Sequence, residues 1–373
     1  MPNNSWLIRY VILAGGLLPG CAADPLPVTP VVEIEVPAVA YDAAPRLTLT
    51  PAATLCDGVT GDCDLMAEVA AEPDVAGGLL VWEFAKALRR YDSSGKRRAD
   101  LGRKGKGPGE YEIAVAAGLS DGGVAVADIA TLRIARFDSA GAFVRFDPLR
   151  NLPQTTRALA FVGGALVVFS VKPLSNGSGS AFRAVRLADG KAQDTLALQL
   201  LPGYASQAGR FQEMPALFSA QPSWKATPDG AVLFTAGAEY DIWEYRDGAA
   251  TRHLRVEHAP REVEQSELDR ETMTRQARSM PPQMRAAVDD AIRRAAAVHP
   301  SVTQLIGVPD GGLLVREAED ITGDSVRWTR FDRDWQPTGY FILPAANRIL
   351  LVQPERMLVQ ADEQTALRWF AVP

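Results

Sequence analysis

The chain has 373 residues, of which 47% are hydrophobic and 23% charged, and its formal net charge is −6. This hydrophobic content is typical of a globular protein and excludes a largely disordered chain. The acidic balance argues against a nucleic-acid partner, because such proteins neutralise phosphates with clustered lysine and arginine. Three cysteines are too few for a scaffold held together by disulfides.

The amino terminus is predicted to be a signal peptide, residues 1–20. Arg9 precedes an apolar run, residues 11–18, which is too short to span a bilayer because spanning needs about 20 apolar residues. The sequence LPGC at residues 18–21 then resembles the lipobox of bacterial lipoproteins. That resemblance implies cleavage after residue 20 and a diacylglycerol on Cys21. The alternative is an ordinary signal peptide that is cut elsewhere.

The segment after the cleavage site is predicted to be a tether, residues 21–45. It contains five prolines, which disfavour helix and favour an extended chain. Ala22 follows the cysteine in place of an aspartate, and by resemblance to lipoproteins of diderm bacteria this implies the outer membrane, facing the periplasm or the cell surface. The lipid would then be the sole contact with the membrane. Cleavage leaves 38 basic and 45 acidic side chains, a net charge of −7.

Cys56 and Cys63 are predicted to form a disulfide. They bracket a turn-forming segment, they remain as an even pair once Cys21 carries lipid, and the cell envelope is oxidising. Closing a loop of about eight residues would stabilise the fold by roughly 2.5 kcal/mol. The alternatives are two free thiols or metal ligation, although two ligands are too few for a structural zinc site.

Residues 46–373 carry six copies of a degenerate repeat. Each copy begins at a turn and continues with two short β-rich runs; the copies start at residues 77, 121, 163, 229, 310 and 355. A spacing of about 41–45 residues between undisturbed copies is that of a four-stranded propeller blade. The repeat therefore predicts an all-β fold, a six-bladed β-propeller. We expect a strand at Arg46–Thr50 to pair beside Leu367–Val372 and close the ring.

Two intervals between copies are long. Residues 191–227 are expected to be rich in loops. Residues 261–298 are predicted to be a helical insert between blades four and five, with Pro281 and Pro282 separating a helix over Glu262–Met280 from one over Gln283–Val298. The second helix carries apolar residues at helical spacing: Met284, Val288, Ala291, Ile292 and Ala295. The insert either braces the rim or acts as a lid or docking element.

A glycine-rich string, GRKGKGPGEY at residues 102–111, follows the first copy. With the Asp-Gly turns, it resembles the family of bacterial six-bladed β-propeller lipoproteins related to NHL-repeat propellers. An Asp-x₄-Arg-Ile element, with Asp128 and Arg133, matches the same family. The resemblance implies the propeller architecture for the whole body, but no activity. The residues that carry it are Gly105, Gly107, Pro108, Gly109, Glu110, Asp128 and Arg133.

These motif residues are interpreted as structural. The string does not have the order of a phosphate-binding loop, and a strand pattern rather than a helix follows it. It is therefore expected to be a turn between blades. Asp128 and Arg133 are expected to form an ion pair that stabilises a blade, the alternative being a catalytic pair.

No catalytic, metal or cofactor site is predicted. The mature chain has three asparagines, too few for the oxygen-rich calcium centre of propeller lactonases. His253, His258 and His299 flank the insert and are expected at the surface, which argues against a zinc site in the channel. The expected function is a binding or scaffold module for an unidentified envelope protein or ligand. The alternative is a hydrolase or lyase in the central channel, which clustered Asp, Glu or His at a channel mouth would favour.

Overall fold

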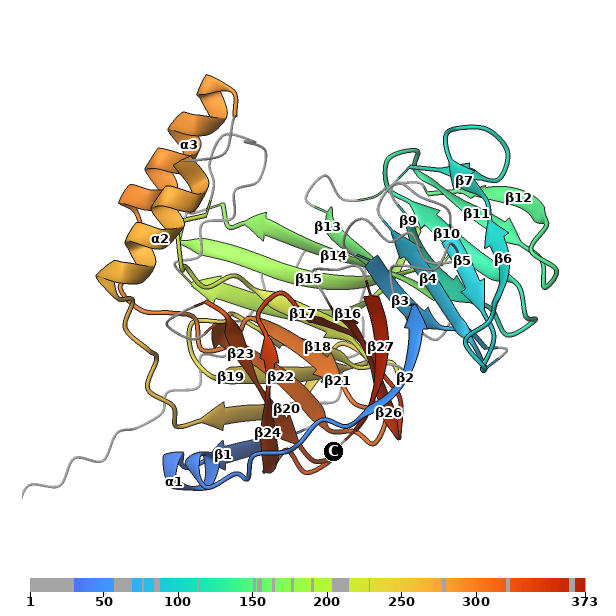
Figure 1. The fold of residues 1–373 in the computed structure, drawn as a ribbon. Coiled ribbons are helices and arrows are strands. Elements are labelled where there is room, and N and C mark those ends of the chain that lie inside the picture. Colours follow the sequence, from blue (N-terminus) through green and yellow to red (C-terminus); the bar gives the residue numbers. More distant parts are fainter. Residues whose placement is uncertain are drawn as a thin grey trace, which may run out of the picture.

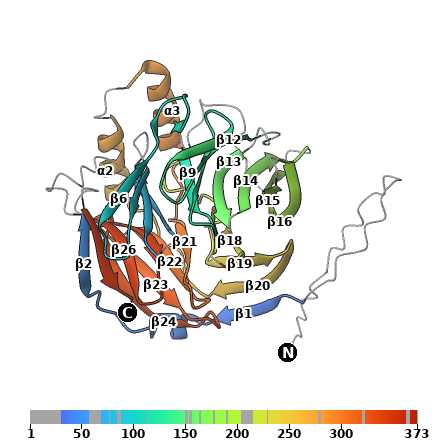
Figure 2. The ribbon, with the colours of Figure 1, turned by 90° about the vertical axis from the view of Figure 1, so that its right-hand side faces the viewer.

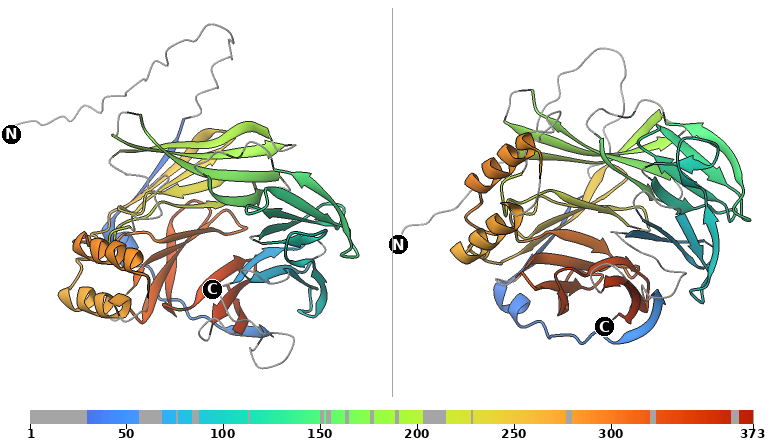
Figure 3. Two further views of the ribbon diagram at one scale, coloured as in Figure 1. Left: turned by 90° about the horizontal axis from the view of Figure 1, so that it is seen from above. Right: turned by 45° about the horizontal axis from the view of Figure 1, so that its top comes forward.

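A computed structural model of the chain describes residues 30–56, 69–75, 77–83, 88–112, 114–149, 152, 156–162, 165–175, 178–188, 191–202, 215–227, 229–276, 280–319, 323–361 and 366–372. Within these residues, six blade sheets follow one another around a ring, and the sequence colours follow the ring in the same order (Figure 3). Five of the sheets have four antiparallel strands, and the sheet of the fourth blade gains a fifth, parallel strand at its outer edge. This is the six-bladed β-propeller that the repeat predicts.

Blade I contains β3 (Val69–Pro73), β4 (Leu79–Glu83), β5 (Leu88–Tyr91) and β6 (Arg97–Leu101), and blade II contains β9 (Ala114–Gly118), β10 (Val124–Asp128), β11 (Arg133–Phe137) and β12 (Phe143–Pro148). Blade III contains β13 (Thr156–Val162), β14 (Ala165–Pro173), β15 (Gly179–Ala188) and β16 (Lys191–Pro202), and blade IV contains β17 (Ser223–Ala226), β18 (Val232–Thr235), β19 (Asp241–Arg246) and β20 (Ala249–Val256). Blade V contains β21 (Gln304–Gly307), β22 (Leu313–Glu319), β23 (Ser325–Phe331) and β24 (Pro337–Pro344), and blade VI contains β25 (Arg348–Val352), β26 (Arg356–Ala361), β27 (Ala366–Ala371) and β2 (Pro51–Cys56).

Each predicted copy corresponds to the two middle strands of one blade. A middle strand is paired on both edges and packed on both faces, so it reads as a continuous apolar run. In β10, for example, all five residues of Val124–Asp128 are buried. The outer strand of blade III was missed: β16 occupies residues 191–202 of the stretch expected to be loops, where Leu196, Leu198 and Leu200 alternate with polar or small residues.

The ring is closed by an amino-terminal strand in the last blade. β2 pairs with β27, so the predicted partner strand is correct but the predicted segment lies five residues early. Arg46 instead forms a bridge with Tyr340 in blade V, and the Thr50 carbonyl accepts a hydrogen bond from Ala371 at 2.9 Å. Sequence-distant strands therefore hold the first and last blades together.

Residues 32–47, most of which were expected to be tether, lie against the ring. β1 (Val32–Val36) pairs in parallel with β20, and α1 (Ala38–Asp42) follows it along the lower edge in Figure 1. Apolar and acidic residues alternate in β1, the period of a strand, and Pro30 and Pro37 border this strand without interrupting it. Within the described residues the proline-rich segment is thus folded. Residues 21–29 lie outside them.

The helical insert is confirmed between blades IV and V. α2 (Gln265–Gln276) and α3 (Pro282–Arg293) lie side by side at the edge of the ring (Figure 1), and Pro282 occupies the first turn of α3, where a missing amide donor costs nothing. α3 buries Val288 and Ala291 as predicted, whereas Met284 is exposed. In the described part of the chain no helix is long and apolar enough to span a membrane.

The core is divided among the blade interfaces. Among the described residues, six hydrophobic clusters are found, and each joins two neighbouring blades. The cluster between blades IV and V also contains Val36 and Tyr41 from the amino-terminal segment. Each blade packs both of its faces against its neighbours. The first strand is the inner edge of each sheet, so the first strands surround the centre of the ring (Figure 2).

Candidate functional site

The main candidate site is a cavity of about 760 Å³ where the first strands of the six blades end. We call it the channel mouth. Its lining comes from every blade: Glu72, Pro73 and Val75 (I), Ala117 to Ser120 (II), Ala160 and Phe161 (III), Lys225 to Thr227 (IV), Ile306, Gly307 and Pro309 (V), and Leu350 to Pro354 (VI). The first strands run side by side around the ring, so their carboxyl ends converge at one mouth.

Small residues bring the channel walls together at this end. A Cβ on Gly307 would lie 2.6 Å from Cγ2 of Thr227, and one on Gly118 would lie 3.0 Å from the Val75 amide nitrogen. Both glycines therefore allow the first strands of adjacent blades to approach closely.

The channel mouth is mainly apolar and contains two charged side chains in its described lining, Glu72 and Lys225. They belong to β3 of blade I and β17 of blade IV, which lie opposite each other in a ring of six. Both are half-buried, and neither makes a hydrogen bond or close ion pair with another residue that the structure describes. Burial raises the pKa of the Glu72 carboxyl, and the Lys225 ammonium opposes that shift.

The described lining contains few groups that take part in acid–base chemistry. Glu72 is the sole carboxylate in the described lining, and no histidine or cysteine faces it. Neither Glu72 nor Lys225 makes a hydrogen bond with a hydroxyl group of the described lining, so the structure shows no nucleophile paired with its base there. Across the described ranges, no group of three or more His, Cys, Asp or Glu side chains could hold a metal ion.

Glu72 and Lys225 were missed by sequence reasoning. Each is the single charge in a short first strand, VAAEP or SWKA, and these strands carry no part of the recognised repeat. Their opposition across the channel arises from ring closure, which a sequence pattern does not show.

A second cavity, of about 560 Å³, lies between α2 and blade V. The connection from β20 to β21 carries α2, so this groove is at the opposite end of the ring from the channel mouth. Its deepest acid, Glu267, is buried, pairs with Arg261 at 2.6 Å and lies 3.2 Å from Nε2 of His299. Burial would raise the pKa of Glu267, but hydrogen bonds from Arg261, the Glu264 amide and His299 outweigh it and lower the pKa to about 2.

These contacts assign the groove a structural role. Arg261 precedes α2, Glu267 lies in its first turn, and His299 follows α3, so the cluster ties both ends of the insert together. The carboxylate is already satisfied by three partners, and its lowered pKa disfavours a proton-transfer role at neutral pH. This supports the brace rather than the lid.

The expectation that the histidines lie at the surface is wrong for two of them. His253 is fully buried in β20, stacks on Trp243 at 3.7 Å, and lies between Glu33 at 2.7 Å and Asp241 at 2.9 Å. His299 is buried under α2, and His258 is half-buried. β1 covers His253 and α2 covers His299, and the sequence pattern did not show these two contacts. None of the three lines the channel mouth.

The glycine-rich string forms a compact turn between blades I and II. β7 (Arg103–Lys104) pairs with β8 (Glu110–Tyr111), and Glu110 accepts hydrogen bonds from the Gly107 amide at 2.7 Å and from Arg103 at 2.7 Å. Gly105 has a φ of +150°, a conformation that L side chains rarely adopt, and a Cβ there would lie 2.2 Å from Oε2 of Glu110 and would displace this carboxylate. Gly109 has a φ of +71°, a conformation that favours glycine, and Pro108 precedes it. The carboxylate thus occupies the place that a bound anion would need.

Asp128 and Arg133 are register partners on β10 and β11. The buried Asp128 accepts hydrogen bonds from the Glu112 amide and Thr131, and Arg133 donates to the Glu110 carbonyl at 3.0 Å and stacks on Phe146. These contacts fasten the glycine-rich turn onto blade II. The ion pair between the two residues stays a prediction, as does their structural role.

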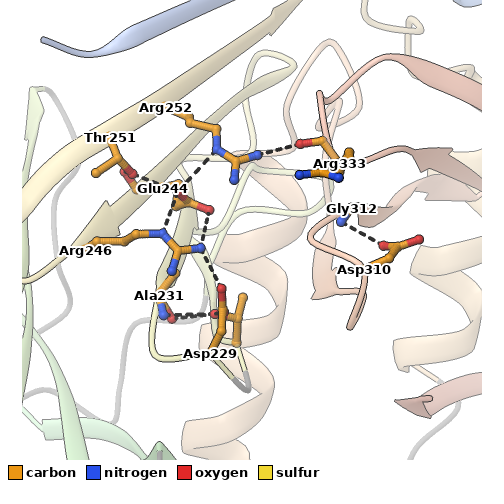
Figure 4. A network of polar contacts seen from close by, with 10 residues as sticks. Asp229, Ala231, Glu244, Arg246, Thr251, Arg252, Asp310, Gly312 and Arg333 are labelled. Carbon is orange, nitrogen blue, oxygen red and sulfur yellow. Dashed lines mark hydrogen bonds and ion pairs between the residues drawn. The ribbon is translucent and has the colours of Figure 1, made fainter. Parts of the chain in front are cut away.

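Three blades share an arginine on the third strand that pairs with an aspartate near the first turn. The pairs are Arg90–Asp74 at 2.5 Å, Arg246–Asp229 at 2.7 Å and Arg330–Asp310 at 3.0 Å. Figure 4 shows the blade IV pair, where the buried Glu244 also contacts Arg246, and where Arg252 donates to the Arg333 carbonyl of blade V at 2.8 Å. Recurrence in three blades identifies these pairs as braces.

The lipid and disulfide predictions remain open. Cys21 and Cys63 lie outside the described residues, and Cys56 is the last residue of β2.

No family model and no curated protein sequence matches the chain. Among solved structures, it is similar to a Bacteroides fragilis protein described as exported, with 12% identity, coverage of 92% of this chain and 99% of that chain, and a TM-score of 0.50. It also resembles virginiamycin B lyase from Staphylococcus aureus, with 14% identity, coverage of 87% and 99%, and a TM-score of 0.43. Aldose sugar dehydrogenase from Streptomyces coelicolor has 12% identity, coverage of 89% and 100%, and a TM-score of 0.44. At such identities, the likeness to the exported protein shows the propeller fold alone.

Proposed function

We propose that this protein is a lipid-anchored binding module of the bacterial cell envelope, which holds a ligand at the channel mouth. The observation that carries the proposal is the convergence of six first strands on one mainly apolar cavity that contains two unpaired charges of opposite sign. Mainly apolar pockets with few polar groups are the usual form of small-molecule sites. A hydrolase or lyase at the same place lacks support, because Glu72 is the sole carboxylate in the described lining.

The location rests on the lipobox resemblance at Cys21 and on the signal pattern before it. An exported protein with this fold from Bacteroides fragilis agrees with the location proposed. The module would then act at the outer membrane, facing the periplasm or the cell surface.

A thermal-shift experiment tests the proposal. A ligand that binds only the folded protein stabilises it, by about 2.7 kcal/mol at a concentration of one hundred times Kd. We expect the small-molecule fraction of a native envelope extract to raise the unfolding temperature of the wild-type protein. The variant Ala117→Phe, which places a ring in the cavity, should show no such rise. A rise of equal size in both proteins, or in neither, would contradict binding at the channel mouth.

A further inference from the structure

We propose that the ligand of the channel mouth is a short apolar peptide with free ends, whose amino group binds Glu72 and whose carboxylate binds Lys225. This inference rests on the proposed function, because it names the ligand class of the same site. The two charged residues lie on β3 and β17, in blades I and IV. In a ring of six these blades are opposite, so the anionic and cationic walls face each other across the cavity.

Both charges are available to a ligand. Among the described residues, neither Glu72 nor Lys225 has a hydrogen-bond or close ion-pair partner, although both are half-buried. The other charged pairs described above are satisfied within the protein, as for Arg90 with Asp74. Glu72 and Lys225 attract each other electrostatically but form no contact ion pair. A half-buried charge without a close partner is unfavourable, and a ligand group of opposite charge in contact with it reduces that penalty. The raised pKa of Glu72 has this same cause, its burial.

The cavity walls between the two charges determine which kind of chain can connect the two ends of the ligand. They are contributed by blades II, III, V and VI and include Ala117, Phe161, Ile306 and Leu350. An apolar chain that crosses the cavity would remove these surfaces from water, worth roughly 25 cal/mol per Å² buried. A ligand with a single sign of charge, such as a nucleotide or a polyamine, would meet repulsion at one wall. A zwitterion with apolar side chains matches both charges and the apolar walls between them.

Isothermal titration calorimetry with a series of leucine and alanine peptides, two to five residues long, tests this inference. Each length is compared as the free peptide, with the amino end acetylated, and with the carboxyl end amidated. We expect acetylation to weaken binding to the wild-type protein at least tenfold, and amidation to do the same. An extended residue adds about 3.3–3.6 Å, so the preferred length reports the separation of the two charges.

Two variants assign each end to its partner. Glu72→Gln should weaken the free peptide about as much as acetylation does, and acetylation should then cause no further loss. Lys225→Met should behave in the same way toward amidation. Glu264→Gln and Lys104→Met, at exposed positions outside the lining, are the matched controls and should bind like the wild type.

The outcomes separate this inference from the function on which it rests. If free and capped peptides bind alike, or none binds while the envelope fraction still stabilises the wild type and not Ala117→Phe, the peptide inference is overturned and the binding function stands. If the envelope fraction also fails to distinguish Ala117→Phe, both are overturned.

Discussion

At the scale of single residues, the Asp74–Arg90 pair joins the first two blades. Arg90 binds both oxygens of Asp74, at 2.5 and 3.1 Å, and donates to the carbonyls of Ser139 and Gly122 in blade II at 2.9 Å each. The side chain of Asp74 is 1% exposed. The same pair in blade V is more accessible, because the side chain of Asp310 is 50% exposed.

This difference in exposure predicts different costs for the same substitution. Asp74→Asn leaves a buried guanidinium without its counter-charge and should lower the free energy of unfolding by about 3–5 kcal/mol. Asp310→Asn, its matched control, should cost less than about 1 kcal/mol because water screens the exposed pair. Urea denaturation of both variants measures the two costs. Equal losses would contradict the assignment of Asp74 as a buried brace.

Sequence reasoning at this scale succeeded where a motif is local. Glu110 and the glycines beside it lie within a few residues of one another, and their turn was expected between blades I and II. It failed for Glu72, Lys225 and His253, whose surroundings depend on segments far away in the chain. His253 is buried because β1 covers β20, and no pattern near residue 253 indicates that contact.

At the scale of elements, the amino-terminal segment is the main departure from expectation. Tyr41 on α1 inserts between blades IV and V, where its hydroxyl contacts Glu317 and Thr329 and its ring packs on Tyr240. Arg327 lies over the same ring at 4.6 Å. Thr329 on β23 is a polar residue, yet it is fully buried because Tyr41 of α1 covers it.

Removal of the Tyr41 side chain should release this segment. Tyr41→Ala leaves a large cavity and a buried carboxylate without one of its donors, which should destabilise the docked segment by about 3–5 kcal/mol. Limited proteolysis should then cut within residues 32–47 well before the ring unfolds. Val39→Ala, on the exposed side of the same helix, should leave the cutting rate unchanged. If both variants resist proteolysis like the wild type, Tyr41 is not the anchor.

The insert should weaken in acid. The pKa of Glu267 is lowered from 4.5 to about 2, so the folded insert takes up this proton less readily than the unfolded one. The ionised Glu267 carboxylate therefore stabilises the folded insert above about pH 4.5, and this stabilisation is lost as the pH falls toward 2. The shift corresponds to about 3 kcal/mol of stability.

Hydrogen exchange of the α2 amides measures this loss. In the wild type, the protection of these amides should fall between pH 4.5 and 2, after correction for the intrinsic exchange rate. In Glu267→Gln, the α2 amides should be poorly protected already at neutral pH, and acid should change their protection little. The α3 variant Asp289→Asn provides a comparison outside the cluster. A pH profile in Glu267→Gln like that of the wild type would show that another group controls the insert.

At the scale of the whole molecule, the architecture was the most predictable feature. Each of the six repeat copies contains the two buried middle strands of one blade, so the number of copies indicates the number of blades. The closing of the ring by an amino-terminal strand was expected from this six-bladed architecture. What the sequence did not show is how the remaining chain covers the ring. Because β1 is docked on blade IV and begins at Val32, a lipid at Cys21 would be eleven residues from the fold, a reach of about 40 Å at most. The outer edge of blade IV would then lie near the membrane.

The anchor predicts a simple change in distribution. Cys21→Ala removes the thiol that would carry the lipid, so the protein should leave the membrane fraction, with its propeller intact. Cell fractionation and intact-mass analysis of the wild type, which should carry a diacylglycerol, measure this. A Cys21→Ala protein that stays in the membrane fraction would contradict the lipobox interpretation.

Site-specific photocrosslinking in the native envelope tests the central claim most directly. A benzoylphenylalanine at Phe161 lies in the channel mouth, and one at Val144 on β12 lies on the exposed outer rim. Binding at the channel mouth predicts a defined adduct from position 161 that is absent at position 144 and is lost in Glu72→Gln and Lys225→Met backgrounds. An adduct that forms equally at both positions, or no adduct at 161, would contradict it.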